Sequence, residues 1–174
     1  METDQETCAL LPLAAAEGLL RQCGELRFVV RGGSMIPQIY PGDEVIVRSA
    51  DLSEIEKGQI VLFSRNSRWF VHRVHQILPA GEYPLLQTQG DALVESDPMV
   101  SGQELLGRVD YVIRHGEWRR VPAADSLLRK LFGILVRYVP HLPGACVRWH
   151  EMGSRRAAKR TVAVQAAHRL RESQ

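Results

Sequence analysis

The chain has 174 residues, enough for one compact domain with appendages but too few for two full domains. Hydrophobic residues make up 45% of it and charged residues 24%, ordinary proportions for a globular protein that exclude wholesale disorder. The three cysteines are odd in number and show no CxxC spacing, so neither a disulfide framework nor a structural zinc site is indicated. We therefore expect no metal and no other cofactor.

Charge is divided unevenly along the chain. Residues 1–118 carry 10 Lys and Arg against 17 Asp and Glu, whereas residues 119–174 carry 12 against 3. This split predicts a body with a basic extension, whose candidate partners are an anionic membrane surface, nucleic acid or an acidic protein. No apolar stretch approaches the ~20 residues that cross a bilayer, and the first residues are acidic, unlike those of a secretory signal. We expect a cytoplasmic protein, with peripheral attachment to the inner face of the membrane as an open alternative.

Predicted elements begin with a short helix. Residues 13–23 are rich in Ala and Leu and stop at Gly24, which indicates a helix with a glycine end. From residue 26 to 121, short β-branched runs alternate with Gly, Pro, Asp and Asn turns, which predicts a mainly β, antiparallel, barrel-like domain. The expected strands are 28–30, 45–47, 60–63, 69–77, 85–88, 105–113 and 118–121, the last two joined as a hairpin through His115 and Gly116.

After Pro122 the pattern becomes helical. Asp125 or Ser126 is the expected N-cap of a helix over residues 127–139, and Pro140 is its stop. A narrow basic face over a broad apolar one suits docking on the β domain and lying in a membrane interface equally well. The predicted organisation is an N-terminal helical segment (1–25), a β domain (26–121) and a basic, amphipathic helical extension (122–174).

One serine stands out in an open, glycine-preceded turn. Ser34 follows Gly32 and Gly33 between two strand-like runs, which makes it a candidate nucleophile. A serine hydroxyl is a weak nucleophile near neutral pH, so it needs a base and a group that orients the base. His72 is the natural base, because alternate residues of a strand face opposite sides and His75 then points away. The same alternation disfavours a zinc site shared by the two histidines.

Two aspartates are candidates for orienting His72. Asp91 follows a glycine in a turn and Asp97 precedes a proline, and either can accept the ring N–H and stabilise an imidazolium. The residues alone do not choose between them, and Asp91 also fits a purely structural Asx-type turn. The backbone N–H of Ser34 is the obvious oxyanion donor. The preceding glycines allow close approach of an extended substrate that pairs as an added strand.

Short boxes in one order carry a family resemblance. Gly33-Ser34-Met35-Ile36-Pro37, then His72-Arg73-Val74, then Gly90-Asp91 resemble the type I signal peptidase superfamily, specifically its serine–histidine branch without the usual transmembrane anchor. The resemblance spans about residues 28–109. It implies a serine endopeptidase that cleaves a leader or precursor peptide through an acyl-enzyme on Ser34, with His72 as general base. It favours Asp97 over Asp91 as the orienting group, and makes Gly32, Gly33 and Met35 the oxyanion and substrate-binding set.

Two other interpretations remain open. Related domains occur in self-cleaving repressors and mutagenesis proteins of the DNA-damage response, which use a lysine base and usually carry a helix-turn-helix. Here His72 holds the base position and about 25 residues precede the β domain, so a nucleic-acid partner is disfavoured. The third interpretation is a catalytically idle domain that binds peptides or a partner protein. It is favoured by Gly32 and Gln59, which stand where the family usually has a serine and an aspartate.

Overall fold

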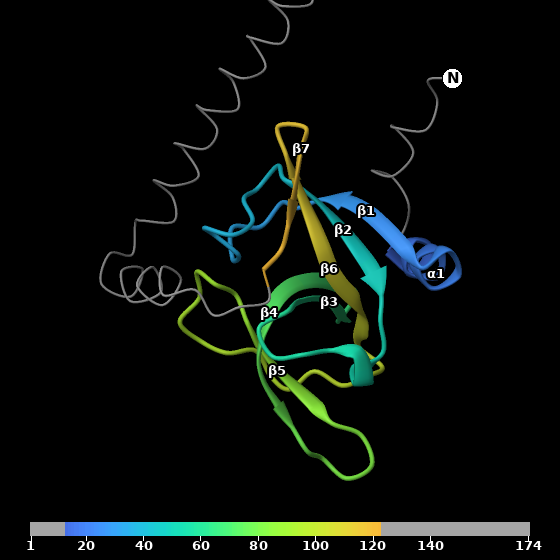
Figure 1. Cartoon of the computed structure of the whole chain (residues 1–174). Coiled ribbons are helices and arrows are strands. Elements are labelled where there is room, and N and C mark those ends of the chain that lie inside the picture. Colours follow the sequence, from blue (N-terminus) through green and yellow to red (C-terminus); the bar gives the residue numbers. More distant parts are fainter. Residues whose placement is uncertain (1–12, 123–174) are drawn as a thin grey trace, which may run out of the picture.

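The computed structural model describes residues 13–122 of the chain. Helix α1 (Leu13–Cys23) precedes an antiparallel sheet with the order β1-β2-β6-β3-β4-β5, and β7 pairs with β6 (Figure 1). The mainly β, antiparallel prediction with an N-terminal helix is confirmed, although the path of paired strands does not close on itself within residues 13–122. The strands are β1 (Glu25–Val29), β2 (Glu44–Ser49), β3 (Ile60–Arg65), β4 (Arg68–Leu78), β5 (Leu85–Gln89), β6 (Leu105–Arg114) and β7 (Glu117–Arg120), with a short 3-10 helix, η2 (Leu52–Glu54), between β2 and β3.

Helix α1 lies next to β1, at one end of the sheet (Figure 1). Its Ala16 and Leu20 side chains are buried in the core. The helix ends as predicted, because Gly24 adopts a φ of 76° and its N–H donates to the Leu20 carbonyl at 2.9 Å. The Trp69 indole N–H also donates to the Glu17 carboxylate at 2.9 Å, which ties the helix to β4.

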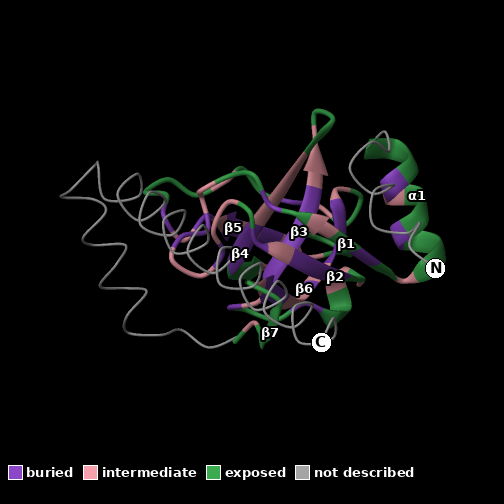
Figure 2. Ribbon diagram, turned by 90° about the horizontal axis from the view of Figure 1, so that it is seen from above, coloured by how far each residue is buried: buried purple, intermediate pink, exposed green. Residues whose placement is uncertain are grey.

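Strand β3 is buried on both faces. Ile60 and Leu62 contribute to a core cluster that includes the residues of α1, whereas Val61 and Phe63 contribute to a second cluster with residues of β4, β5 and β6. The buried segments of Figure 2 accordingly lie in the central strands, and the exposed ones on the outer face of α1 and in the loops. A strand with two buried faces explains the uninterrupted apolar run at this position. Phe63 of the second cluster also contacts the ring of His72 on β4.

The hairpin turn predicted at His115 and Gly116 is confirmed. His115 and Gly116 have φ values of 54° and 81°, so both central residues of the β6–β7 turn are left-handed, as a type I′ hairpin requires. The predicted helix at 127–139 and the rest of the extension lie outside the described residues. Within residues 13–122 no helix is long and apolar enough to span a membrane.

Candidate active site

Ser34 lies in a turn between β1 and β2 whose apolar side chains point inward. Met35 is 1% exposed, and Ile36 and Ile39 are fully buried. The N–H groups of Gln38 and Ile39 both donate to the Met35 carbonyl, at 2.8 and 2.9 Å. These anchors leave Ser34 half-buried at the surface of the turn. Burial of the Met35 side chain in the core restricts any part of this residue in substrate binding to its backbone.

The end of the same turn is fixed by a buried ion pair. The Asp43 carboxylate accepts a hydrogen bond from the Tyr40 backbone N–H at 2.8 Å and one from Arg114 Nη2 at 2.6 Å. Arg114 also lies 4.6 Å above the centre of the Tyr40 ring. The Pro41-Gly42-Asp43 reversal is thereby attached to β6.

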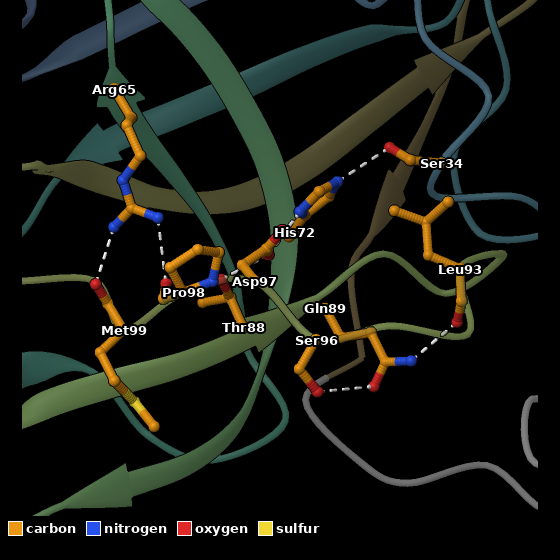
Figure 3. A network of polar contacts seen from close by, with 10 residues as sticks. All are labelled: Ser34, Arg65, His72, Thr88, Gln89, Leu93, Ser96, Asp97, Pro98 and Met99. Carbon is orange, nitrogen blue, oxygen red and sulfur yellow. Dashed lines mark hydrogen bonds and ion pairs between the residues drawn. The ribbon is translucent and has the colours of Figure 1, made fainter.

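Ser34, His72 and Asp97 form one hydrogen-bonded chain (Figure 3). The distance from His72 Nε2 to Ser34 Oγ is 3.0 Å, and the distance from His72 Nδ1 to Asp97 Oδ2 is 2.7 Å. His72 is only 4% exposed. Residues separated by 38 and 25 positions in the chain are therefore brought into the arrangement of a nucleophile, a base and an orienting carboxylate.

Aromatic side chains hold the His72 ring in place. The ring centres of Phe63 and Phe70 lie 6.1 and 6.0 Å from that of His72, and the two phenyl rings stack on each other at 5.3 Å. Such contacts restrict rotation of the imidazole. The ring is thus oriented by packing as well as by its two hydrogen bonds.

Thr88 holds Asp97 through both its carboxylate and its backbone. Thr88 Oγ1 donates to Asp97 Oδ2 at 2.7 Å, and the Asp97 backbone N–H donates to the Thr88 carbonyl at 2.8 Å. Burial raises the pKa of Asp97, but hydrogen bonds from His72 and Thr88, with the positive charges of His72 and Arg65, outweigh it and lower the pKa below its ordinary value. Asp97 is therefore ionised at neutral pH.

Asp91, the other candidate, is engaged elsewhere. Its two carboxylate oxygens accept hydrogen bonds from Arg73 Nε and Nη2 at 2.9 and 2.8 Å, and Arg73 Nη1 donates to the Gly58 carbonyl at 2.7 Å. The side chains of Asp91 and Arg73 are 5% and 2% exposed. Both carboxylate oxygens thus face Arg73, and Asp91 makes no contact with His72.

The Gly90-Asp91-Ala92 turn touches the backbone of Ser34. The Ala92 N–H donates to the Ser34 carbonyl at 2.8 Å. A Cβ atom on Gly90 would lie 2.7 Å from that same carbonyl oxygen and 3.0 Å from side-chain carbons of Leu93. Only glycine permits this close approach, so the turn also fixes the position of Ser34.

We expect Gly90→Ala to lower both stability and any activity that depends on Ser34. The added methyl group collides with a backbone atom, and such overpacking commonly costs about 1–3 kcal/mol. Urea unfolding measures the stability effect. Gly18→Ala is the matched control, because no atom lies within 4 Å of its Cβ position and a helix favours alanine. Equal stability of Gly90→Ala and the unchanged protein would contradict the expected collision.

The backbone around Ser34 offers donors for an oxyanion. Within residues 13–122, no protein acceptor is bonded to the N–H of Ser34 or of Met35. Gly32 is exposed, and no atom lies within 4 Å of its Cβ position, whereas a Cβ on Gly33 would meet Ile36 at 3.3 Å. The surface beside Ser34 is therefore open on the Gly32 side. This is the side on which the sequence predicts that an extended substrate approaches.

The sequence interpretation missed the hydrogen bond from Thr88 to Asp97. It also missed the polar contacts that Arg65 makes near Asp97. Arg65 Nε donates to the Glu104 carboxylate at 2.5 Å, and the other Arg65 nitrogens donate to backbone carbonyls next to Asp97. Glu104 also accepts from the Ser101 N–H and hydroxyl. Because Arg65 is 39 positions from Glu104, no local pattern in the sequence signals this group.

Because Glu104 is ionised in the folded protein, we expect its contribution to stability to be lost in acid. Its hydrogen bond from Arg65 is the main reason that its pKa falls from 4.5 to about 2. A carboxylate with a lowered pKa contributes stability above its unfolded pKa and loses it as pH falls through the folded value. The loss of unfolding free energy caused by Glu104→Gln should therefore be largest at pH 7. It should decrease from about pH 5 downward and disappear near pH 2.

Urea unfolding of both proteins at pH 3, 4, 5 and 7 measures this dependence. Glu117→Gln is the control, because Glu117 pairs with Arg119 in full solvent exposure and such pairs contribute little. A Glu104→Gln effect of the same size at pH 3 and pH 7 would contradict the prediction.

A pocket of about 310 Å³ lies away from Ser34, His72 and Asp97. Its lining residues come from the start of β3, the middle of β6 and the end of β7: Gln59, Ile60, Arg108, Val109, Asp110, Arg120, Val121 and Pro122. The pocket does not include the hydrogen-bonded residues Ser34, His72 and Asp97, so we place the candidate site at Ser34 rather than in this pocket. Within residues 13–122 no three His, Cys, Asp or Glu side chains are grouped to hold a metal ion.

Comparison with known proteins gives one family. No curated protein matches the chain. Residues 15–93 match the model of the family described as Peptidase S24-like, and this family supports either a serine peptidase or a self-cleaving, repressor-like protein. The match includes Ser34, His72 and Asp91 but ends before Asp97. Just under half of the chain, including two of the three hydrogen-bonded residues, is thus similar to Peptidase S24-like domains.

Proposed function

We propose that this protein is a serine endopeptidase that cleaves a leader or precursor peptide through an acyl-enzyme on Ser34. The observation that supports it best is the hydrogen-bonded chain from Ser34 Oγ through His72 to Asp97. Each member is suited to its role: the hydroxyl is half-buried, the imidazole is buried and packed, and the carboxylate is ionised. The similarity of residues 15–93 to Peptidase S24-like domains supports the same class of reaction.

In the proposed reaction, Ser34 Oγ attacks the carbonyl carbon of the scissile peptide bond. His72 Nε2 accepts the hydroxyl proton, while its Nδ1–H remains bonded to Asp97, whose negative charge stabilises the imidazolium. The backbone N–H groups of Ser34 and Met35 are available to donate to the tetrahedral oxyanion. The preorganised donors stabilise charge that develops only in the transition state.

The acyl-enzyme then forms and breaks down by the reverse proton path. The C–N bond breaks as His72 returns its proton to the leaving amine, which leaves an ester on Ser34. A water molecule gives a proton to His72 and attacks the ester carbonyl, and the C–O bond to Ser34 breaks as His72 returns that proton to Ser34 Oγ. The products are a new carboxyl terminus, a new amino terminus and the original hydroxyl.

The edge of β1 supports binding of the peptide as an added strand. Val30 exchanges its backbone hydrogen bonds with Gly42 and Asp43, so the backbone groups of Val29 and Arg31 point to the opposite, outer edge. Among residues 13–122, β1 is the end strand of the sheet, and it leads directly to the turn of Ser34. A peptide that pairs with this edge brings its carbonyl groups in sequence toward the hydroxyl.

Mass spectrometry of a diverse peptide library tests the function. Wild type, Ser34→Ala and His72→Ala are incubated in parallel, together with labelling by a fluorophosphonate, which reacts with activated serines. We expect new peptide termini and a labelled Ser34 in the wild type alone. Cleavage that persists in Ser34→Ala contradicts the proposal. A wild type that neither cleaves nor becomes labelled favours the idle peptide-binding interpretation instead.

The family match favours a second candidate, a regulatory protein that cleaves its own chain. The same Ser34 and His72 then act on a segment of the protein itself. Intact-mass measurement of wild type and Ser34→Ala over prolonged incubation separates the two candidates. Fragments that appear only in the wild type, at a rate independent of protein concentration, indicate self-cleavage. An intact chain that cleaves added peptides indicates an endopeptidase acting on other proteins.

We also propose that the basic extension directs the enzyme to the inner face of the membrane. The excess of positive charge in residues 119–174 supports this, because each basic residue adds about 1 kcal/mol at an anionic surface. Flotation of the full chain with vesicles containing phosphatidylserine provides the test. Replacement of Arg155, Arg156, Lys159 and Arg160 with glutamine should weaken binding at least tenfold. Equal binding to uncharged vesicles contradicts the proposal.

A further inference from the structure

Arg65, the last residue of β3, bonds to the segment that carries Asp97. Its Nη1 donates to the Pro98 carbonyl at 3.1 Å and its Nη2 to the Met99 carbonyl at 2.7 Å (Figure 3). The two carbonyls directly follow Asp97 in the chain. One guanidinium therefore contacts two consecutive peptide groups next to the carboxylate that orients His72.

Other anchors of this segment lie on either side of these carbonyls. The Asp97 N–H bonds to Thr88 at 2.8 Å, and Val100 exchanges hydrogen bonds with Leu86 at 2.8 and 2.9 Å. Between these anchors Pro98 and Met99 are exposed, and Pro98 has no N–H to donate. Within residues 13–122, Arg65 is the one donor bonded to the carbonyls of Pro98 and Met99.

Arg65 itself is held in a fixed orientation. Its Nε donates to Glu104 at 2.5 Å, and Glu104 is bonded in turn to the N–H and hydroxyl of Ser101. The guanidinium carbon also lies 5.6 Å from the centre of the Phe63 ring, which packs against His72. All three guanidinium nitrogens thus have protein acceptors, and a planar fork of this kind cannot be reproduced by lysine.

We propose that Arg65 is a positioning residue, which fixes the Asp97 carboxylate against His72 Nδ1 by clamping the two peptide groups that follow it. The inference rests on the proposed function, but it concerns a contact that can be measured without turnover. Arg65 touches neither His72 nor Ser34, so its effect on the reaction passes through Asp97. Its positive charge acts in the same direction, because it favours the ionised form of that carboxylate.

The test compares Arg65→Gln and Arg65→Lys with Arg108→Gln in the full chain. Arg108 is the matched control, because it is similarly half-buried, pairs with Asp110 at 2.8 Å and has no contact with residues 97–99. The first readout is the low-field proton resonance of His72 Nδ1–H, which reports its hydrogen bond to Asp97 and is assigned by its loss in His72→Gln. The second is the rate at which a fluorophosphonate labels Ser34.

We expect the resonance and rapid labelling in wild type and Arg108→Gln. In Arg65→Gln the resonance should disappear and labelling should slow by about 10–100-fold, because small displacements of catalytic groups have effects of this size. Arg65→Lys keeps the charge but not the fork, and should fall between the two. Where peptides are cleaved, kcat should fall by the same factor with KM within about twofold.

Other outcomes are equally decisive. An unchanged resonance in both Arg65 variants overturns the inference, as does its loss in Arg108→Gln, which would indicate a general structural effect. Thermal melting identifies a variant that fails to fold, and in that event the folded Arg65→Lys decides the question. If the wild type shows the resonance but neither labels nor cleaves, the proposed function fails while the role of Arg65 in positioning Asp97 is still measured.

Discussion

Replacement of Asp97 by alanine is expected to lower kcat for peptide cleavage by about 10⁴-fold, the usual effect of losing the aspartate of a catalytic triad. The change removes the acceptor of the 2.7 Å bond from His72 Nδ1 and the negative charge that stabilises the imidazolium. KM should change little, because Asp97 contacts His72 and Thr88 rather than the surface beside Gly32. Steady-state kinetics with a peptide identified from the library measures both constants.

Asp97→Asn should be less damaging than Asp97→Ala. The Thr88 hydroxyl donates to the same carboxylate oxygen, Oδ2, that accepts from His72. An asparagine is therefore favoured with its amide oxygen at that position, where it keeps the imidazole oriented but supplies no negative charge. Thr88→Val combined with Asp97→Asn removes this preference and should lower kcat further.

Ser96→Ala serves as the control for both variants, because Ser96 is exposed and, among residues 13–122, its hydroxyl is bonded only to Gln89, at 3.5 Å. Its kcat should remain within about twofold of wild type, as expected for a weak surface contact. If Asp97→Ala retains a tenth or more of the wild-type kcat, Asp97 is not the orienting group.

Loss of Asp91 is expected to have the largest effect on stability. Asp91→Ala leaves the Arg73 guanidinium, 2% exposed, without its carboxylate, and an uncompensated buried charge of this kind costs about 3–5 kcal/mol. The turn that contacts the Ser34 carbonyl also loses its attachment to β4. Urea unfolding should show the loss directly, and activity should fall with it.

A double-mutant cycle distinguishes the pair from its separate residues. Arg73→Leu combined with Asp91→Leu removes both charges, so the double variant should be more stable than the sum of the single changes predicts. Glu117→Ala is the control for an exposed pair and should cost less than about 1 kcal/mol. Additive effects of the two buried changes would show that the ion pair is not the source of the stability.

The sequence interpretation was most successful where local patterns decide the structure. The helix at 13–23 is confirmed with its predicted limits, and each predicted run of β-branched residues corresponds to an observed strand. The predicted turn at His115 and Gly116 has the left-handed backbone that a tight hairpin needs. Alternation of residues in β4 also explains why His72 bonds to Ser34 while Arg73, its neighbour, bonds to Asp91 and Gly58.

The contacts of the two aspartates could not be read from local patterns. Local patterns do not choose between Asp91 and Asp97 as the partner of His72, since both lie in turns after β5, although the family resemblance favours Asp97. Pairing of β4 with β5 places Gln89 opposite Arg73, so the turn that starts at Gly90 brings Asp91 to Arg73. The chain then reverses beside β5, and Asp97 bonds to Thr88 and faces His72.

The amino-acid sequence by itself determined the elements, their turns and the pair Ser34 and His72, because residue alternation and turn chemistry act over a few neighbouring positions. Only the tertiary structure decided that Asp97 rather than Asp91 lies against His72, that Asp91 pairs with Arg73, and that Arg65 clamps the segment after Asp97. These contacts join residues 18 to 34 positions apart. They depend on strand register and on a loop that doubles back, which are set by packing of the whole sheet.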